Sequence, residues 1–145
     1  MSQLMLFKLL DKTWVHEDYA DWLIHIQDEC TTRRNVIVGA CEKYLPSVVT
    51  WDPPMAGMYH WVEADCRKHP HTSSKSITEL REDLFLRSVE KGSLIVRSSW
   101  IRPEAGLDLG NERMFFRASF AAAPFGSIEE AIRRFGLAVK ESFQL

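Results

Sequence analysis

The stretch Met114–Pro124, MFFRASFAAAP, is almost wholly apolar and carries one arginine, Arg117, in its middle. Because side chains alternate between the two faces of a strand, one face of this stretch is plainly core, and the other is small and aromatic around Arg117. A guanidinium cannot lose its proton to escape burial, so it needs an anionic partner. From these residues alone, two interpretations stay open. Arg117 either pairs with a structural Asp or Glu or lies exposed, or it receives the carboxylate of a ligand.

The spacing of apolar residues predicts the remaining elements. Three- and four-residue steps predict a long helix over 16–45, preceded by a helical segment over 2–10. Segments rich in β-branched and aromatic residues predict four strands, over 48–51, 57–63, 94–96 and 114–121.

Capping signals place two further helices. The sequence S-x-x-E occurs at Ser76 and again at Ser127, and each predicts a capping box at the start of a helix. Pro46 ends the long helix, and Gly92 suits a left-handed residue after the next one. The order α, β-β, α, β-β, α predicts an α/β or α+β domain whose helices cover one face of a mixed, mainly antiparallel four-stranded sheet.

Composition narrows the class of protein. The chain of 145 residues has a formal net charge of −2, which does not favour nucleic acid or an anionic membrane as a partner. Its longest apolar run, residues 5–10, is too short to span a bilayer, and no secretory signal is visible. The three widely spaced cysteines predict reduced thiols, so we expect a cytoplasmic protein.

Three ordered motifs resemble one family. The segment FFRASFAAAP followed by SIEEAIRRFG resembles the closing segment of class I/II aminotransferases, which are pyridoxal-phosphate enzymes of fold type I. Pro53–Glu63, PPMAGMYHWVE, is similar to the family's P-x-G-G-M-F-x-W strand, and Gly92–Val96 is similar to its next strand. The resemblance is greatest to fungal members of the aromatic amino acid, kynurenine and 2-aminoadipate branch. It implies that residues 1–145 are the C-terminal small domain of fold type I, N-terminally truncated and without the large cofactor-binding domain.

The resemblance also implies roles. Arg117 stands where the family's arginine binds the α-carboxylate of the substrate, so Arg117 is the expected substrate-binding residue. The expected substrates are an amino acid, with an aromatic one favoured, and a 2-oxo acid. Complete members use pyridoxal phosphate and form homodimers, but we do not expect this chain alone to hold the cofactor. The sequence departs from the family at two places: Ala56 replaces a glycine, and residues 97–101 replace a Pro-Gly turn that borders the substrate entrance in the family, so the second departure bears on substrate choice.

The chain offers no expected catalytic residue. Thr72–Lys75, TSSK, mimics the family's lysine motif, but it follows the PPMAGM strand where the family's lysine precedes it. It also lies in a polar segment that would not desolvate the amine, so Lys75 is not expected to form a Schiff base. No phosphate-binding loop is present. His69-Pro70-His71 lacks a third ligand and is predicted to be plain surface, so no metal site is expected.

Other residues are assigned ordinary roles. We expect a half-buried, hydrogen-bonded His60, solvated or ion-paired side chains for Arg97 and Arg102, and packing roles for Tyr59 and Trp100. Apolar residues within 5–10 are expected to form an exposed patch that drives association.

Three functions stay open at this point. The first is the small domain of an aminotransferase, the second is a non-catalytic remnant or interaction module related to aminotransferases, and the third is a small-molecule-binding α+β regulatory domain. The third requires a preformed pocket around Arg117.

Overall fold

The computed structural model describes residues 2–97 and 113–145, and the chain divides into two compact units, residues 1–32 and 33–145. The first unit holds helix α1 (Ser2–Lys8), the π-helical turn η1 (Leu9–Thr13) and the beginning of α2 (Val15–Tyr44). The predicted helical segments over 2–10 and 16–45 are therefore confirmed. Of the predicted patch, Met5, Leu6 and Phe7 are exposed, as is the neighbouring Leu4, whereas Leu9 and Leu10 are partly buried, and the association itself stays a prediction.

The second unit is built on a four-stranded sheet in the order β1-β2-β4-β3. Its strands are β1 (Val49–Trp51), β2 (Tyr59–Ala64), β3 (Val96–Arg97) and β4 (Met114–Ser119). All three pairings are antiparallel, and Trp61 of β2 stands opposite Arg117 of β4. The predicted α+β architecture is confirmed, although β3 begins two residues later than expected and is shorter.

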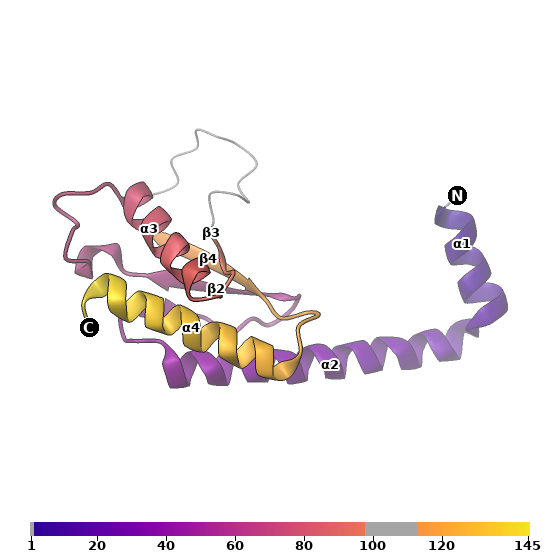
Figure 1. Ribbon diagram of the computed structural model, residues 1–145. Coiled ribbons are helices and arrows are strands. Elements are labelled where there is room, and N and C mark those ends of the chain that lie inside the picture. The colour runs from indigo at the N-terminus through magenta and orange to yellow at the C-terminus, as the bar shows by residue number, and fades with distance from the viewer. Residues whose placement is uncertain (1, 98–112) are drawn as a thin grey trace. The chain divides into compact units, whose positions relative to one another are not determined.

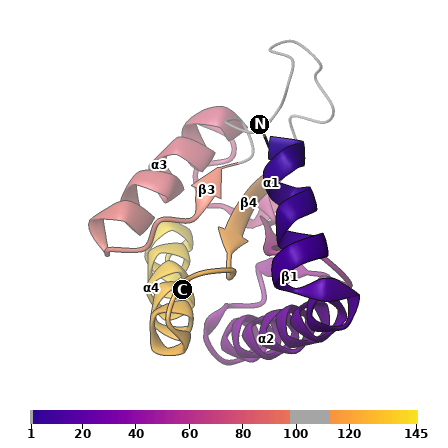
Figure 2. The ribbon, with the colours of Figure 1, turned by 90° about the vertical axis from the view of Figure 1, so that its right-hand side faces the viewer.

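Helices cover one face of this sheet. The end of α2, α3 (Ile77–Glu90) and α4 (Phe125–Phe143) supply buried apolar side chains that pack against Val62, Phe116 and their neighbours. Figures 1 and 2 show α4 running between α3 and the end of α2. The strands place alternate residues in this core, so β4 has the burial pattern expected from its sequence, with Met114, Phe116 and Ala118 buried.

The two predicted capping boxes have different outcomes. At Ser76 the box is complete: the hydroxyl accepts from the Glu79 N–H at 3.3 Å, and the Glu79 carboxylate accepts from the Ser76 N–H at 2.8 Å. The box at Ser127 is wrong, because α4 begins at Phe125 with Pro124 as its cap. The Pro124 carbonyl accepts from the N–H groups of Ser127 and Ile128, so Ser127 already lies inside the first turn.

Helix α2 continues without a break through Arg33 and Arg34. Both side chains reach backbone carbonyls: Arg33 donates to Ala123, and Arg34 donates to Pro54 at 2.6 Å. These contacts tie the end of α2 to the segments that follow β4 and β1. None of the helices in the described part of the chain is both long and apolar enough to cross a membrane.

Candidate functional site

The face of the sheet opposite the helices carries the candidate site. We call it the open face; it is defined by alternate residues of β1, β2 and β4, namely Thr50, Tyr59, Trp61, Glu63, Phe115 and Arg117. Tyr59 and Trp61 are 42% and 41% exposed, whereas His60 and Val62 between and beside them are buried. The sheet therefore separates a packed surface from one that is available to a ligand.

Arg117 lies half-buried on the open face. Its guanidinium carbon is 4.1 Å from the centre of the Tyr59 ring, a cation–π contact. No carboxylate among residues 2–97 and 113–145 forms an ion pair with Arg117, so the structural Asp or Glu partner is not found in the described chain. The Tyr59 ring contacts the flat face of the Arg117 guanidinium. This contact leaves the N–H groups at the edge of the guanidinium available for a carboxylate.

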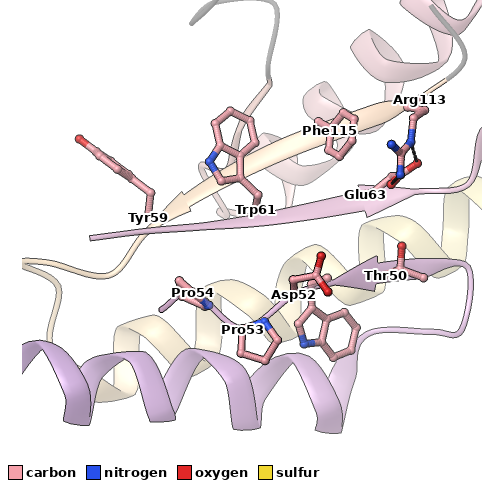
Figure 3. A pocket seen from close by; sticks show the side chains of 10 residues that line it. Thr50, Asp52, Pro53, Pro54, Tyr59, Trp61, Glu63, Arg113 and Phe115 are labelled. Atoms are coloured by element: carbon pink, nitrogen blue, oxygen red, sulfur yellow. Dashed lines mark hydrogen bonds and ion pairs between the residues drawn. The ribbon is translucent and has the colours of Figure 1, made fainter. Parts of the chain in front are cut away.

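A cleft of about 550 Å³ extends along the same face. Figure 3 shows Trp61 and Phe115 pointing from β2 and β4 to the same side, with Tyr59 at one end and the Arg113–Glu63 pair at the other. Tyr59 therefore belongs both to the support of Arg117 and to the wall of the cleft. The full lining is Thr50, Trp51, Asp52, Pro53, Pro54, Tyr59, Trp61, Glu63, Arg113 and Phe115.

The far end of the cleft is closed by an ion pair that sequence reasoning missed. Arg113 Nε donates to Glu63 Oε1 at 2.6 Å, and Arg113 Nη2 donates to Glu63 Oε2. The Glu63 side chain is 19% exposed, the Arg113 side chain is 60% exposed, and the pair raises the pKa of Arg113. Alternation alone indicates that Arg113 and Arg117 share a face, but only the register of β2 against β4 brings Glu63 beside Arg113.

The lysine motif has the surroundings expected from the sequence. Lys75 lies in an exposed turn and forms an ion pair with Asp83 of α3. None of the four strands carries a lysine, so the described open face has no amine on a strand. A pyridoxal-phosphate cofactor would therefore find no strand lysine here for covalent attachment.

Two of the three histidines named from the sequence differ from their predicted surroundings. His60 is fully buried on the helix-covered face, and neither ring nitrogen has a hydrogen-bond partner within the described residues. Burial lowers the pKa of His60 to about 4. The prediction of a half-buried, hydrogen-bonded His60 is wrong, since alternation on β2 points this side chain inward among apolar residues.

His69 is also buried, so the prediction that His69-Pro70-His71 is plain surface is wrong for this residue. Its Nδ1 accepts from the His71 N–H at 3.2 Å, which leaves Nε2–H to donate to the Ser142 hydroxyl at 3.0 Å. Desolvation lowers the pKa of His69. His69 thus ties the loop to the end of α4, and no group of His, Cys, Asp and Glu in the described residues is arranged to hold a metal ion.

Of the other residues named from the sequence, some have the predicted role and others lie outside the described residues. Arg97 forms the expected ion pair, with Glu82, and lies 5.2 Å from the Phe85 ring. No disulfide joins any of Cys30, Cys41 and Cys66 in the described structure, as expected. Arg102 and Trp100 lie outside the described residues, as does most of the segment 97–101 where the sequence departs from the family pattern.

Comparisons with known proteins connect this geometry to one group of enzymes. No family model matches the chain. An aminotransferase of Arthroderma benhamiae, swnA, is 33% identical over 99% of the chain, and an aromatic amino acid aminotransferase of Schizosaccharomyces pombe is 34% identical over 99%. The crystal structure of the aminotransferase Aro8 from Candida albicans matches 99% of the chain with a TM-score of 0.89 and 30% identity. The chain spans about 30% of the length of these relatives.

Proposed function

We propose that this chain, which is related over its whole length to aminotransferases, is the small domain that binds the substrate carboxylate in such an enzyme. The observation that carries the proposal is Arg117, whose guanidinium lies on the Tyr59 ring beside a cleft and has no carboxylate partner among the described residues. Arginine matches a carboxylate with two parallel N–H···O bonds. An amino acid and a 2-oxo acid both carry this carboxylate next to the reacting carbon.

The role of Arg117 in this proposal is to bind and orient. Holding the carboxylate fixes the neighbouring carbon in one geometry, which is a large part of what an enzyme supplies to a reaction between two groups. The cleft beside it is walled by aromatic rings and favours an aromatic side chain on the substrate. The name of the Schizosaccharomyces pombe relative, an aromatic amino acid aminotransferase, supports the same substrate class.

In this proposal, the cofactor is bound by another part of the enzyme. Aminotransferases use pyridoxal phosphate, which supplies an electron sink when bound. The described residues do not fit its covalent attachment, because no strand carries a lysine and Lys75 is ion-paired in an exposed turn. We therefore assign the cofactor to another part of the enzyme and expect no catalytic residue in residues 1–145. The homodimer, the cytoplasmic location and the domain bounds stay predictions.

Titration of the chain with phenylpyruvate, followed by NMR of backbone and arginine side-chain N–H groups, tests the role of Arg117. We expect saturable shifts at Arg117 and its neighbours, and loss of binding in Arg117→Ala. Arg67→Ala, which removes a surface arginine paired with Asp65, is the matched control and should bind like the parent. Unchanged affinity of Arg117→Ala would overturn the proposal.

The lysine-free strands favour a second candidate, a non-catalytic module related to aminotransferases. Mixing the chain with phenylalanine, 2-oxoglutarate and pyridoxal phosphate separates the two interpretations of activity. We expect no transamination by the chain alone, and turnover would show that the cofactor assignment above is wrong. If the chain also fails to bind phenylpyruvate, the non-catalytic module is the better description.

A further inference from the structure

We propose that Glu63 selects the substrate class: by occupying the guanidinium of Arg113, it leaves the cleft suited to an uncharged aromatic side chain and unsuited to a second carboxylate. This inference rests on the proposed function, in which Arg117 holds the first carboxylate. It concerns the end of the cleft away from Arg117, where Arg113 pairs with Glu63, so this inference and the proposed function can fail separately.

Two arginines lie on the open face, one within β4 and one directly before it. Arg113, Phe115 and Arg117 follow one another at two-residue steps, so all three lie on the open face. With a rise of about 3.4 Å per residue, the Cα atoms of Arg113 and Arg117 are about 14 Å apart. Trp61 stands opposite Arg117, and Glu63 stands opposite Phe115. A ligand held by Arg117 and extending along the strands would therefore meet aromatic rings first and Arg113 last.

The charge at that far end decides what the cleft accepts. A free Arg113 would offer a second guanidinium fork, and a dicarboxylic acid would bridge the two arginines. Glu63 instead accepts from both Nε and Nη2 of Arg113, which is the pairing that a ligand carboxylate would need. The Glu63 side chain is 19% exposed and the Arg113 side chain is 60% exposed, so Glu63 is the more buried partner of the pair.

The middle of the cleft favours the same class of ligand. Phe115 lines it between the two arginines, Trp61 lines it at the level of Arg117, and Tyr59 lines its near end (Figure 3). Aromatic rings pack favourably on such walls, whereas a carboxylate without a partner there would lose its hydration. The cleft volume of about 550 Å³ lies within the usual range of small-molecule sites, so a single aromatic side chain can be accommodated.

The test compares two 2-oxo acids on the full 145-residue chain. Phenylpyruvate carries an aromatic side chain, and 2-oxoadipate carries a second carboxylate. We expect Glu63→Gln, which keeps the size of the side chain and frees the Arg113 fork, to strengthen 2-oxoadipate binding about two- to fivefold. The ratio of 2-oxoadipate affinity to phenylpyruvate affinity should therefore rise by about the same factor. The control Glu129→Gln breaks another glutamate ion pair, with Lys43, and should change neither affinity.

A double variant separates charge from structure. Adding Arg113→Gln to Glu63→Gln removes the freed guanidinium, and we expect the gain in 2-oxoadipate affinity to disappear. An unchanged ratio of the two affinities in Glu63→Gln, or a gain that persists in the double variant, would overturn the inference while leaving the assignment of Arg117 intact. Binding of both acids to Arg117→Ala would instead overturn the proposed function.

Discussion

The two faces of the sheet are made from the same strands and differ in nearly every other respect. On β2, His60 and Val62 point into the helix-covered core, and Tyr59 and Trp61 point to the open face. The covered face holds a histidine with no hydrogen-bond partner among the described residues, whereas the open face holds two arginines, Arg113 and Arg117, each over an aromatic ring. Stability and ligand binding therefore depend on alternate residues, and neighbouring substitutions should separate them.

The largest expected effect is on the free energy of unfolding, when two adjacent phenylalanines of β4 are each replaced by alanine. Phe116 is fully buried and lies 5.4 Å from the Phe135 ring of α4, so Phe116→Ala should lower the free energy of unfolding by about 3–5 kcal/mol. Phe115 lies on the open face, and Phe115→Ala should cost only about 1 kcal/mol. Urea unfolding of both variants measures the difference. Equal losses would show that the open face is as tightly packed as the core.

The second prediction concerns the loss of folding stability at low pH. The pKa of His60 is about 4 in the folded chain and 6.5 in the unfolded one, so protons bind the unfolded chain more readily in this range. Stability should be fully present above pH 6.5 and should fall as the pH drops toward 4, by about 3 kcal/mol from this residue. Unfolding measured at several pH values gives the slope.

His60→Leu is the matched variant for this prediction. It replaces an imidazole that has no hydrogen-bond partner among the described residues with an apolar side chain, so it should remove most of the pH dependence and leave stability at pH 7 equal or higher. His69 has a lowered pKa of its own and should account for part of the remaining slope. A parent-like slope in His60→Leu would show that another group carries the acid sensitivity.

The same comparison explains which features were predictable from sequence. Alternation on β4 placed Phe116 in the core and Arg117 on the opposite face, since it depends only on the period of a strand. The capping box at Ser76 followed from local sequence, but Ser127 did not cap α4 because Pro124 began the helix earlier. The Arg113–Glu63 pair depends on strand register, which joins residues fifty positions apart and leaves no local pattern.

A smaller effect is expected where two covered-face helices meet. A Cβ added at Gly136 of α4 would lie 2.6 Å from the backbone carbonyl oxygen of Tyr44 at the end of α2. Gly136→Ala should therefore force the helices apart and cost about 1–3 kcal/mol. Gly126→Ala is the control, because a Cβ there meets nothing within 4 Å. Thermal unfolding compares them, and a Gly136→Ala variant as stable as the control would contradict this packing.

The smallest expected effect tests how the open face holds Arg117. The Tyr59 ring lies 4.1 Å from the guanidinium carbon, so Tyr59→Leu removes the cation–π contact but keeps apolar bulk. Phenylpyruvate affinity should fall about two- to fivefold, whereas the free energy of unfolding should change by less than about 1 kcal/mol. Tyr59→Phe keeps the ring and should restore the affinity. If Tyr59→Leu and Tyr59→Phe bind alike, the ring does not position the guanidinium, and Arg117 acts without its support.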